Sequence, residues 1–180
     1  MLYGDWNCGA TSLTAIRVAQ AVRGEDVMLE QPCKTLEACA EVRKVAAMPM
    51  KIDENAHDIA SLLQAHRLGC MDVVALKLSK FGGVSALRRA RDLCIALDTM
   101  MVIEDTWGSD ITTAAVAHMA VSTPRALLLN TCDLSGYVSP HIALDGPRRQ
   151  DACLKPSERP GLGITPNREI LDPALQCHLS

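Results

Sequence analysis

Short apolar runs alternate along the chain with segments in which apolar residues recur at helical spacing. The apolar runs predict strands at 2–5, 27–30, 50–53, 71–78, 100–104 and 126–130. The helical spacing predicts helices at 13–22, 35–47, 55–68, 83–97 and 109–121, with Thr11 or Ser12 capping the first and Thr35 the second. Continuously apolar strands separated by helices indicate a parallel sheet with right-handed crossovers. Beyond Asp133 this pattern ends, so we expect a (β/α) part over 1–134 and an irregular tail over 135–180 that packs on it.

Charged residues stand at the ends of the expected strands at nearly even spacing. Asp5, Glu30, Asp53 and Lys77 are 25, 23 and 24 residues apart, and the next strand ends, near positions 105 and 133, are also acidic. An open doubly wound sheet and a (β/α) barrel both fit the alternation, but charges converging on one face favour the barrel. A complete barrel has eight units and about 250 residues, so the sequence predicts a partial (β/α) barrel of the TIM type.

Three of these strand-end residues are carboxylates, and together they can form a metal site. Asp5, Glu30 and Asp53 offer only oxygen ligands, which Mg²⁺ prefers, and a bound cation would relieve the repulsion among three anions. The alternative is that each is a separate acid at a loop edge. Glu54, beside Asp53, can replace it or support it.

The fourth strand-end residue is a lysine in the stretch Ala75–Gly83, which reads Ala-Leu-Lys-Leu-Ser-Lys-Phe-Gly-Gly. A lysine opposite a magnesium site suggests removal of a proton next to a carboxylate, because the cation stabilises the negative charge that develops. Lys77 lies at the strand end. Lys80 lies three residues further on, where we expect it to be solvated, so we favour Lys77 as the base.

Composition narrows the classes of function. The chain has 180 residues, 48% of them hydrophobic and 3% aromatic, with a net charge of −3 and no basic stripe, which argues against nucleic-acid and membrane partners. No apolar run reaches the roughly 18 residues of a membrane span, and no basic-then-apolar leader precedes the first expected strand. The eight cysteines are scattered, and we interpret them as reduced core thiols of a cytoplasmic protein rather than disulfides or a zinc site.

Five motifs, taken in order, resemble the mandelate racemase/muconate lactonizing group of the enolase superfamily. They are Gly-Asp5-Trp-Asn, Leu-Glu30-Gln-Pro, Ile-Asp53-Glu54, Leu-Lys77-Leu-Ser-Lys-Phe-Gly-Gly and Pro-Gly-Leu-Gly-Ile-Thr-Pro. The resemblance covers essentially the whole chain. It implies a (β/α)7β barrel, with Asp5, Glu30 and Asp53 as Mg²⁺ ligands and Lys77 as acid/base. It also implies a small-molecule carboxylate substrate and a homo-oligomeric full-length protein.

Within that group, the stretch 73–83 and the segment Glu-Asp-Thr-Trp-Gly-Ser-Asp at 104–110 are most similar to cis-3-hydroxy-L-proline dehydratases and hydroxyproline betaine epimerases. The resemblance implies dehydration or epimerisation of a proline-type amino acid or betaine. Other acid-sugar dehydratases, cycloisomerases and dipeptide epimerases remain alternatives. The ring nitrogen of such a substrate can contact the face of Trp107, although this residue can also simply fill a loop pocket. The substrate-binding candidates are Trp107, Asp105, Asp133, Asn7 and Lys80.

Two other polar residues have structural interpretations. We expect Asp110 to cap the helix that follows it and His118 to be structural within that helix, while Asp133 can be either a cap or a substrate contact.

Members of the group also carry a capping domain and two further barrel strands, the second ending in a Lys-x-Lys motif, ahead of the strand that Asp5 would end. We expect the chain to correspond to about strands 3 to 8, without these segments. Two hypotheses follow: the sequence is part of a Mg²⁺-dependent enzyme, or it is a catalytically inactive barrel remnant that binds metal or a partner. A third, an unrelated parallel α/β binding module, would make the regular spacing of the charges a coincidence.

Overall fold

A computed structural model describes residues 2–177 of the chain, and the side chains of residues 2–173. The chain forms two compact units, Met1–Val102 and Ile103–Ser180, which are described separately below. The division falls within the fifth strand. The expected boundary between a barrel part and a tail, after residue 134, stays a prediction.

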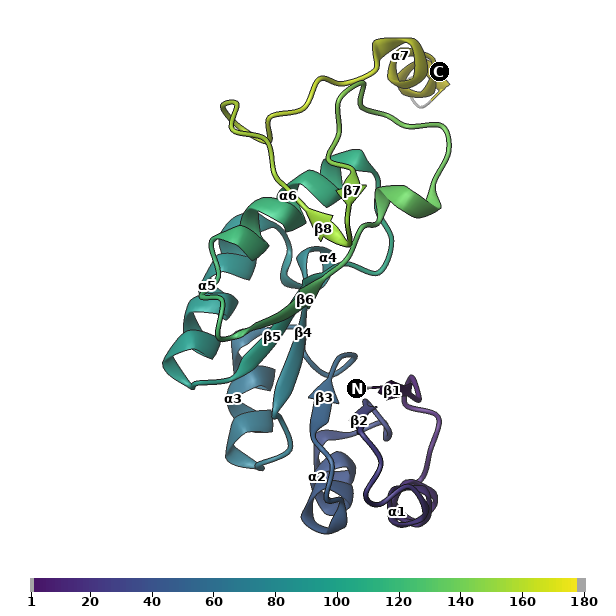
Figure 1. The fold of residues 1–180 in the computed structure, drawn as a ribbon, viewed down its shortest axis with the longest axis vertical. Helices are drawn as coiled ribbons and strands as arrows, with labels where there is room; N and C mark the ends of the chain where they lie inside the picture. The colour runs from purple at the N-terminus through teal and green to yellow at the C-terminus, as the bar shows by residue number, and fades with distance from the viewer. Residues whose placement is uncertain (1, 178–180) are drawn as a thin grey trace. The chain divides into compact units, whose positions relative to one another are not determined.

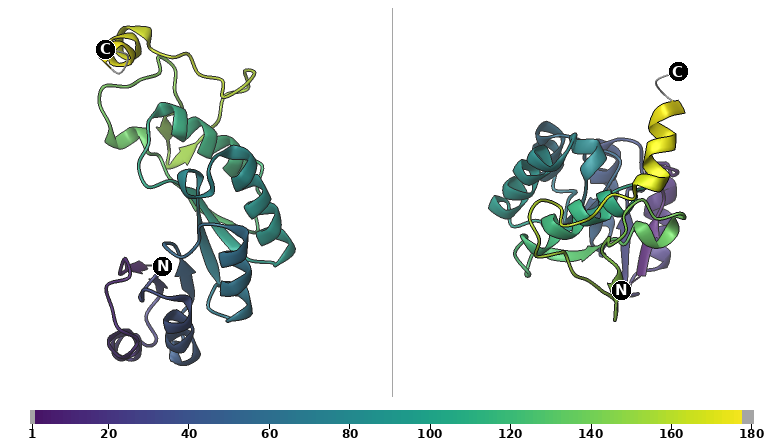
Figure 2. Two further views of the ribbon diagram at one scale, coloured as in Figure 1. Left: turned by 180° about the vertical axis from the view of Figure 1, so that it is seen from behind. Right: turned by 90° about the horizontal axis from the view of Figure 1, so that it is seen from above.

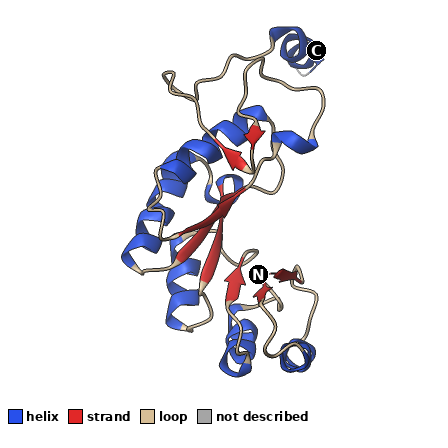
Figure 3. Cartoon of the chain, viewed as in Figure 1, coloured by secondary structure: helices blue, strands red, loops and turns tan. Residues whose placement is uncertain are grey.

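The first unit alternates strands and helices as the sequence predicts (Figures 1 and 3). Its elements are β1 (Leu2–Asp5), α1 (Ser12–Ala21), β2 (Val27–Glu30), α2 (Leu36–Val45), β3 (Met50–Ile52), α3 (Ile59–Arg67), β4 (Val73–Lys77), α4 (Leu78–Phe81) and α5 (Val84–Ala96), followed by β5 (Met100–Glu104), which crosses into the second unit. Two predicted elements need correction. Helix α3 begins at Ile59 rather than residue 55, because Asp58 forms its capping box with Ser61. The short helix α4, directly after β4, was not predicted.

Strands β1 to β4 pair in parallel, and the strands of the main sheet follow one another in chain order. Residues 73–76 of β4 are all buried, which explains why its sequence is continuously apolar. Strand β1 lies at the edge of the sheet, and its Leu2 and Tyr3 are exposed. Helices α3 and α5 pack on each other on the same side of β4, which Figure 2 shows in two further views. This arrangement directs the carboxyl ends of the strands toward one edge of the unit.

The second unit contains α6 (Asp110–Val121), β6 (Leu128–Thr131), the short 3-10 helix η1 (Ser135–Tyr137), the hairpin strands β7 (Arg149–Gln150) and β8 (Cys153–Leu154), and α7 (Arg168–Cys177). Segments beyond β6 pack on α6: the backbone N–H of Ser135 donates to Thr113 Oγ1, and that of Ala143 donates to Asp110. The segment 135–180, expected to be an irregular tail, contains a short hairpin and a helix.

Across residues 2–173, four of the free cysteines (Cys33, Cys39, Cys70 and Cys94) are buried, as expected of core thiols. Cys8 and Cys132 are half-buried and Cys153 is exposed, and Cys177 lies outside the described side chains. No helix in the described part of the chain is long and apolar enough to cross a membrane.

Candidate metal and active site

The strand register places the functional side chains of the first unit on one face of the sheet. Asp5 and Glu30 are direct partners in β1 and β2, and Glu30 is in turn the partner of Lys51 in β3. Asp53 lies two residues beyond Lys51, so it points to the same face. Lys51 is the partner of Val73 in β4, and Lys77 lies four residues beyond Val73, again with the same parity. The functional residues thus advance along successive strands, which is the stagger of tilted strands in a barrel.

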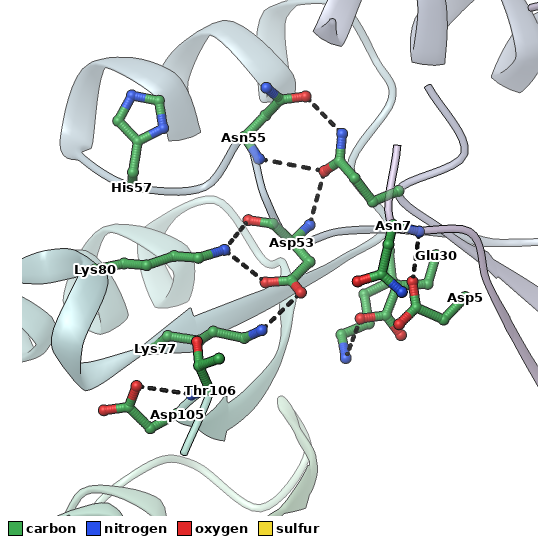
Figure 4. Close-up of polar contacts among 12 residues, drawn as sticks. Asp5, Asn7, Glu30, Asp53, Asn55, His57, Lys77, Lys80, Asp105 and Thr106 are labelled. Carbon is green, nitrogen blue, oxygen red and sulfur yellow. Dashed lines mark hydrogen bonds and ion pairs between the residues drawn. The ribbon is translucent and has the colours of Figure 1, made fainter. Parts of the chain in front are cut away.

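Asp53 is buried and is held between two lysines (Figure 4). The Nζ of Lys77 donates to its Oδ2 at 2.7 Å, and the Nζ of Lys80 donates to its Oδ1 and to its backbone oxygen, each at 2.8 Å. Burial raises the pKa of the Asp53 carboxyl, but hydrogen bonds from Lys77 and Lys80 outweigh this effect and hold the pKa below its ordinary value. The expectation that Lys80 is solvated is therefore wrong: α4 turns it back toward Asp53.

Glu30 has a lysine partner of its own, which sequence reasoning did not identify. The Nζ of Lys51 lies 2.9 Å from Glu30 Oε1, and both side chains are buried. The same Nζ lies 5.6 Å from the ring centroid of Tyr3. Burial raises the pKa of Glu30, and the carboxylates of Asp5 and Asp53 raise it further against the opposing effect of Lys51. Burial is the largest of these effects, so the surroundings of Glu30 disfavour its charged form.

Two further groups complete this edge of the unit. Asp5 is exposed, and its Oδ1 accepts a hydrogen bond from the backbone N–H of Asn7 at 3.0 Å. Glu54 has a buried carboxylate oxygen, Oε2, without a hydrogen-bond partner. Burial, followed by the charge of Asp53, raises the pKa of Glu54. A buried carboxylate oxygen that lacks a partner is costly, and a cation nearby would relieve that cost.

The donor set fits a hard cation in its chemistry. Asp5, Glu30 and Asp53 supply only carboxylate oxygens from one face at the ends of adjacent strands, which suits Mg²⁺. As the side chains stand, no three His, Cys, Asp or Glu groups among the described residues are close enough to hold an ion, because Glu30 and Asp53 face lysines. The three-carboxylate ligand set thus stays a prediction.

The second unit carries the remaining candidates for substrate binding. Trp107 is 71% exposed and meets the ring of Tyr137 edge to face, with ring centroids 6.4 Å apart. It therefore does not fill a loop pocket, which removes one interpretation. Asp105 is buried and accepts the backbone N–H of Thr106. Asp133 accepts hydrogen bonds from Ser135 Oγ and the Gly136 N–H, as a cap does.

Asp133 also lines a cavity within this unit. The cavity has a volume of about 310 Å³, and its lining includes Tyr137 and Arg149 as well. A carboxylate, a phenol and a guanidinium around one cavity can bind both ends of a small zwitterion.

The interpretation of Asp110 as a helix cap is wrong. The cap is Ser109, whose side chain accepts the N–H of Ile111. Asp110 is instead fully buried, and its Oδ1 lies 2.6 Å from Arg148 Nη1 and 3.2 Å from His141 Nδ1. Burial raises the pKa of Asp110, but the hydrogen bonds from Arg148 and the backbone N–H of Ala143 lower it overall.

His118 lies in α6, where its Nε2 is 3.3 Å from the backbone oxygen of Leu162. This contact joins the helix to the segment that follows the hairpin, as expected of a structural histidine.

Comparison with known proteins decides the family. The model of the enolase C-terminal domain-like family matches residues 1–170. The chain belongs to this family. It is 42% identical over 171 residues to a cis-3-hydroxy-L-proline dehydratase from Roseibium aggregatum, an alignment that covers 95% of the chain and 47% of that protein.

Solved structures of the enolase superfamily share the fold. The crystal structure of a mandelate racemase/muconate lactonizing enzyme from Roseovarius nubinhibens ISM superposes with a TM-score of 0.88 and 41% identity, covering 93% of the chain and 45% of that protein. An enolase-superfamily member from the same organism, complexed with magnesium, gives a TM-score of 0.87 and 34% identity, over 93% of the chain and 46% of that protein. The chain thus spans about half the length of these relatives, and its family membership excludes the alternative of an unrelated α/β binding module.

Two residues near this site, Lys51 and Gln31, were not predicted from the sequence. Lys51 is a single charged residue within the apolar strand Met50–Ile52, and that interruption was the available signal. Gln31 follows Glu30 directly and is completely buried, but a glutamine after a strand resembles an ordinary loop residue.

Proposed function

We propose that the protein carrying this chain catalyses Mg²⁺-dependent removal of the proton next to a carboxylate, and so dehydrates or epimerises a proline-type amino acid or betaine. The observation that carries the proposal is the placement of Lys77, 2.7 Å from Asp53, on the same face as Glu30 and Asp5. The identity of 42% to a cis-3-hydroxy-L-proline dehydratase supports the substrate class.

Lys77 is the residue proposed to take the proton. Its side chain is largely buried, at 13% exposure. It lies against the carboxylate of Asp53, whose pKa is below its ordinary value, so this group is charged. When a neutral Lys77 accepts the α-proton it becomes an ammonium, and Asp53 stabilises that positive charge. Lys80 contacts the other oxygen of Asp53 and keeps the carboxylate oriented.

A magnesium ion held by Asp5, Glu30 and Asp53 would supply the positive charge that stabilises the substrate carboxylate as the α-proton leaves. In a dehydration, loss of that proton is followed by departure of the neighbouring hydroxyl, which leaves as water with the proton that Lys77 took up. In an epimerisation, a proton returns from the opposite face.

The second unit supplies the proposed contacts to the ring nitrogen. A protonated or quaternary nitrogen suits the exposed face of Trp107 and the carboxylate of Asp133. Asn7, Asp105 and Lys80 are kept as further substrate-binding candidates.

The test follows exchange of the α-proton by NMR in D2O with Mg²⁺, using L-proline, cis-3-hydroxy-L-proline and a proline betaine. Both the 180-residue chain and a fusion to the N-terminal half of the Roseibium aggregatum dehydratase are measured, because the chain spans 47% of that relative. Exchange that disappears in Lys77→Ala supports the proposal. A folded fusion that binds Mg²⁺ but exchanges no α-proton would instead support an inactive remnant.

A further inference from the structure

Gln31 has hydrogen bonds to three loops that follow strand ends of the first unit. It lies directly after Glu30 and none of its surface is exposed. The loop after β1 carries Asn7 and Cys8, the loop after β2 begins with Gln31 itself, and the loop after β3 carries Asp53 and Asn55. These are the loops that follow the three strand-end carboxylates.

The side-chain amide of Gln31 holds the loop after β3. Its Oε1 accepts the backbone N–H of Asp53 at 3.0 Å and that of Asn55 at 3.3 Å. Its Nε2 donates to the backbone oxygen of Cys33 at 2.9 Å and to Asn55 Oδ1. Each lone pair of the oxygen and each hydrogen of the nitrogen therefore has a partner, and this pattern fixes which end of the amide is which.

The backbone of Gln31 bonds to strand β3 and to the loop after β1. Its N–H donates to the Lys51 oxygen in β3, and its carbonyl accepts the N–H of Cys8 in the loop after β1, both at 2.9 Å. Gln31 has a φ of +33° and Cys8 a φ of +64°, in the left-handed region that non-glycine residues rarely adopt. Such backbone costs energy, and it persists where surrounding contacts determine the conformation, as they do here.

We propose that Gln31 is a positioning residue that sets the spacing of the carboxylates of Asp5, Glu30 and Asp53. This inference rests on the proposed function, because the spacing matters only if these groups act together. The partners of the Gln31 side chain are backbone groups and the side chains of Asn55 and Cys39. Gln31 acts through the main chain of Asp53 and Cys8, so that the strand-end loops keep one relative geometry although each loop is short and irregular.

The amide group is needed for this role. Methionine has nearly the same length as glutamine but neither accepts from Asp53 and Asn55 nor donates to Cys33. Glutamate keeps the accepting oxygen and loses the amide donors. The two substitutions therefore separate the contact to the Asp53 loop from the contact to the loop after β2.

The test measures amide hydrogen exchange by NMR in Gln31→Met and Gln31→Glu of the 180-residue chain. Leu76, in β4, reports general stability, because it is fully buried and belongs to none of these loops. A matched control is Thr113→Val, which removes a buried hydroxyl that accepts a backbone N–H in the second unit. We expect the amides of Asp53 and Asn55, which bond to the side-chain oxygen, to exchange about ten-fold faster in Gln31→Met than the change at Leu76 explains, whereas the Cys8 amide keeps its backbone acceptor. In Gln31→Glu we expect the Asp53 and Asn55 amides to stay protected.

Two results would overturn the proposal. One is a folded Gln31→Met chain in which these amides follow Leu76, and the other is a Gln31→Glu chain in which the Asp53 and Asn55 amides lose protection. If Gln31→Met does not fold, Gln31→Glu alone decides by the same criterion. A Mg²⁺ titration of the original chain and Gln31→Met completes the test, with about ten-fold weaker binding expected in the variant. If the original chain binds no Mg²⁺, the proposed metal fails, while the exchange data still decide whether Gln31 holds the loops.

Discussion

The two units present their charged side chains in different ways. In the first, the charges lie at strand ends, are mostly buried, and face partners from neighbouring elements, as Asp53 faces Lys77 and Lys80. In the second, the buried acid Asp110 anchors a loop through Arg148, while the aromatic side chains Trp107 and Tyr137 stay exposed. The parallel sheet holds the charged side chains of the first unit in place. The side chains of the second unit lie on loops that pack on helix α6.

Under the proposed function, this difference separates the residues that take part in the reaction from those that select the substrate. Reacting groups must be held to within a fraction of an ångström, and strand ends braced by buried ion pairs provide such rigidity. Groups that select a substrate must be accessible, and exposed loop residues meet that need. We therefore expect substitutions in the first unit to abolish reaction or metal response, and substitutions in the second to alter stability or affinity.

The largest effect is expected from Lys77→Ala in the fusion described above. Loss of a general base lowers the rate of α-proton exchange by about 10²- to 10⁴-fold. Binding of Mg²⁺, measured by calorimetry, should change little, because Asp5, Glu30 and Asp53 remain. Lys80→Ala is the matched control, since it removes the other ammonium from the same carboxylate. Equal loss of exchange in the control would assign the base to Lys80 or to the pair.

Asp53→Asn is expected to have the next largest effect. It leaves two partly buried ammonium groups without their carboxylate, so the chain should be less stable by about 3 kcal/mol. The rise in melting temperature with Mg²⁺ should disappear as well. Asp58→Asn serves as the control, because asparagine caps α3 as well as aspartate does. An undiminished Mg²⁺ response in Asp53→Asn would remove this residue from the ligand set.

Asp110→Asn tests the anchor of the second unit through its pH dependence. The folded-state pKa of Asp110 lies below its ordinary value of 3.8, so its carboxylate stabilises the fold above that pH. This stabilisation is lost as pH falls from about 3.8 through the lower folded-state value. We expect Asp110→Asn to be less stable by about 2 kcal/mol near pH 7 and the difference to shrink below about pH 4. A difference that stays constant from pH 7 to pH 3 would contradict this account.

The sequence predicted the first unit well because strands and helices there obey two simple periodicities. Each expected strand is present within a few residues, and Thr11 and Thr35 cap the helices that they were expected to cap. Even spacing of the charged strand ends was enough to place Asp5, Glu30, Asp53 and Lys77 on one face, because register and parity follow from the strands.

The rest depended on contacts that periodicity does not encode. Lys80 returns to Asp53 only because α4 follows β4 without a loop, and nothing in the spacing indicates that short helix. Asp110 follows a residue that can also cap a helix, and only its burial against Arg148 distinguishes the two roles. Gln31 forms hydrogen bonds to backbone groups of other loops, and the presence of a glutamine at this position does not predict such contacts.

Trp107→Ala should give the smallest effect, and it tests selection most directly. Trp107 is 71% exposed and contacts Tyr137 only edge to face, so the melting temperature should hardly change. A cation held on an aromatic face contributes about 0.5–2 kcal/mol, so the apparent affinity for a proline betaine should fall about 2- to 30-fold while the maximal exchange rate is kept. Trp107→Phe should recover part of the loss, because a smaller aromatic face attracts a cation less strongly than indole does. A loss of affinity that is equal for the betaine and for a substrate analogue with a neutral ring atom would mean that Trp107 shapes the site without recognising charge.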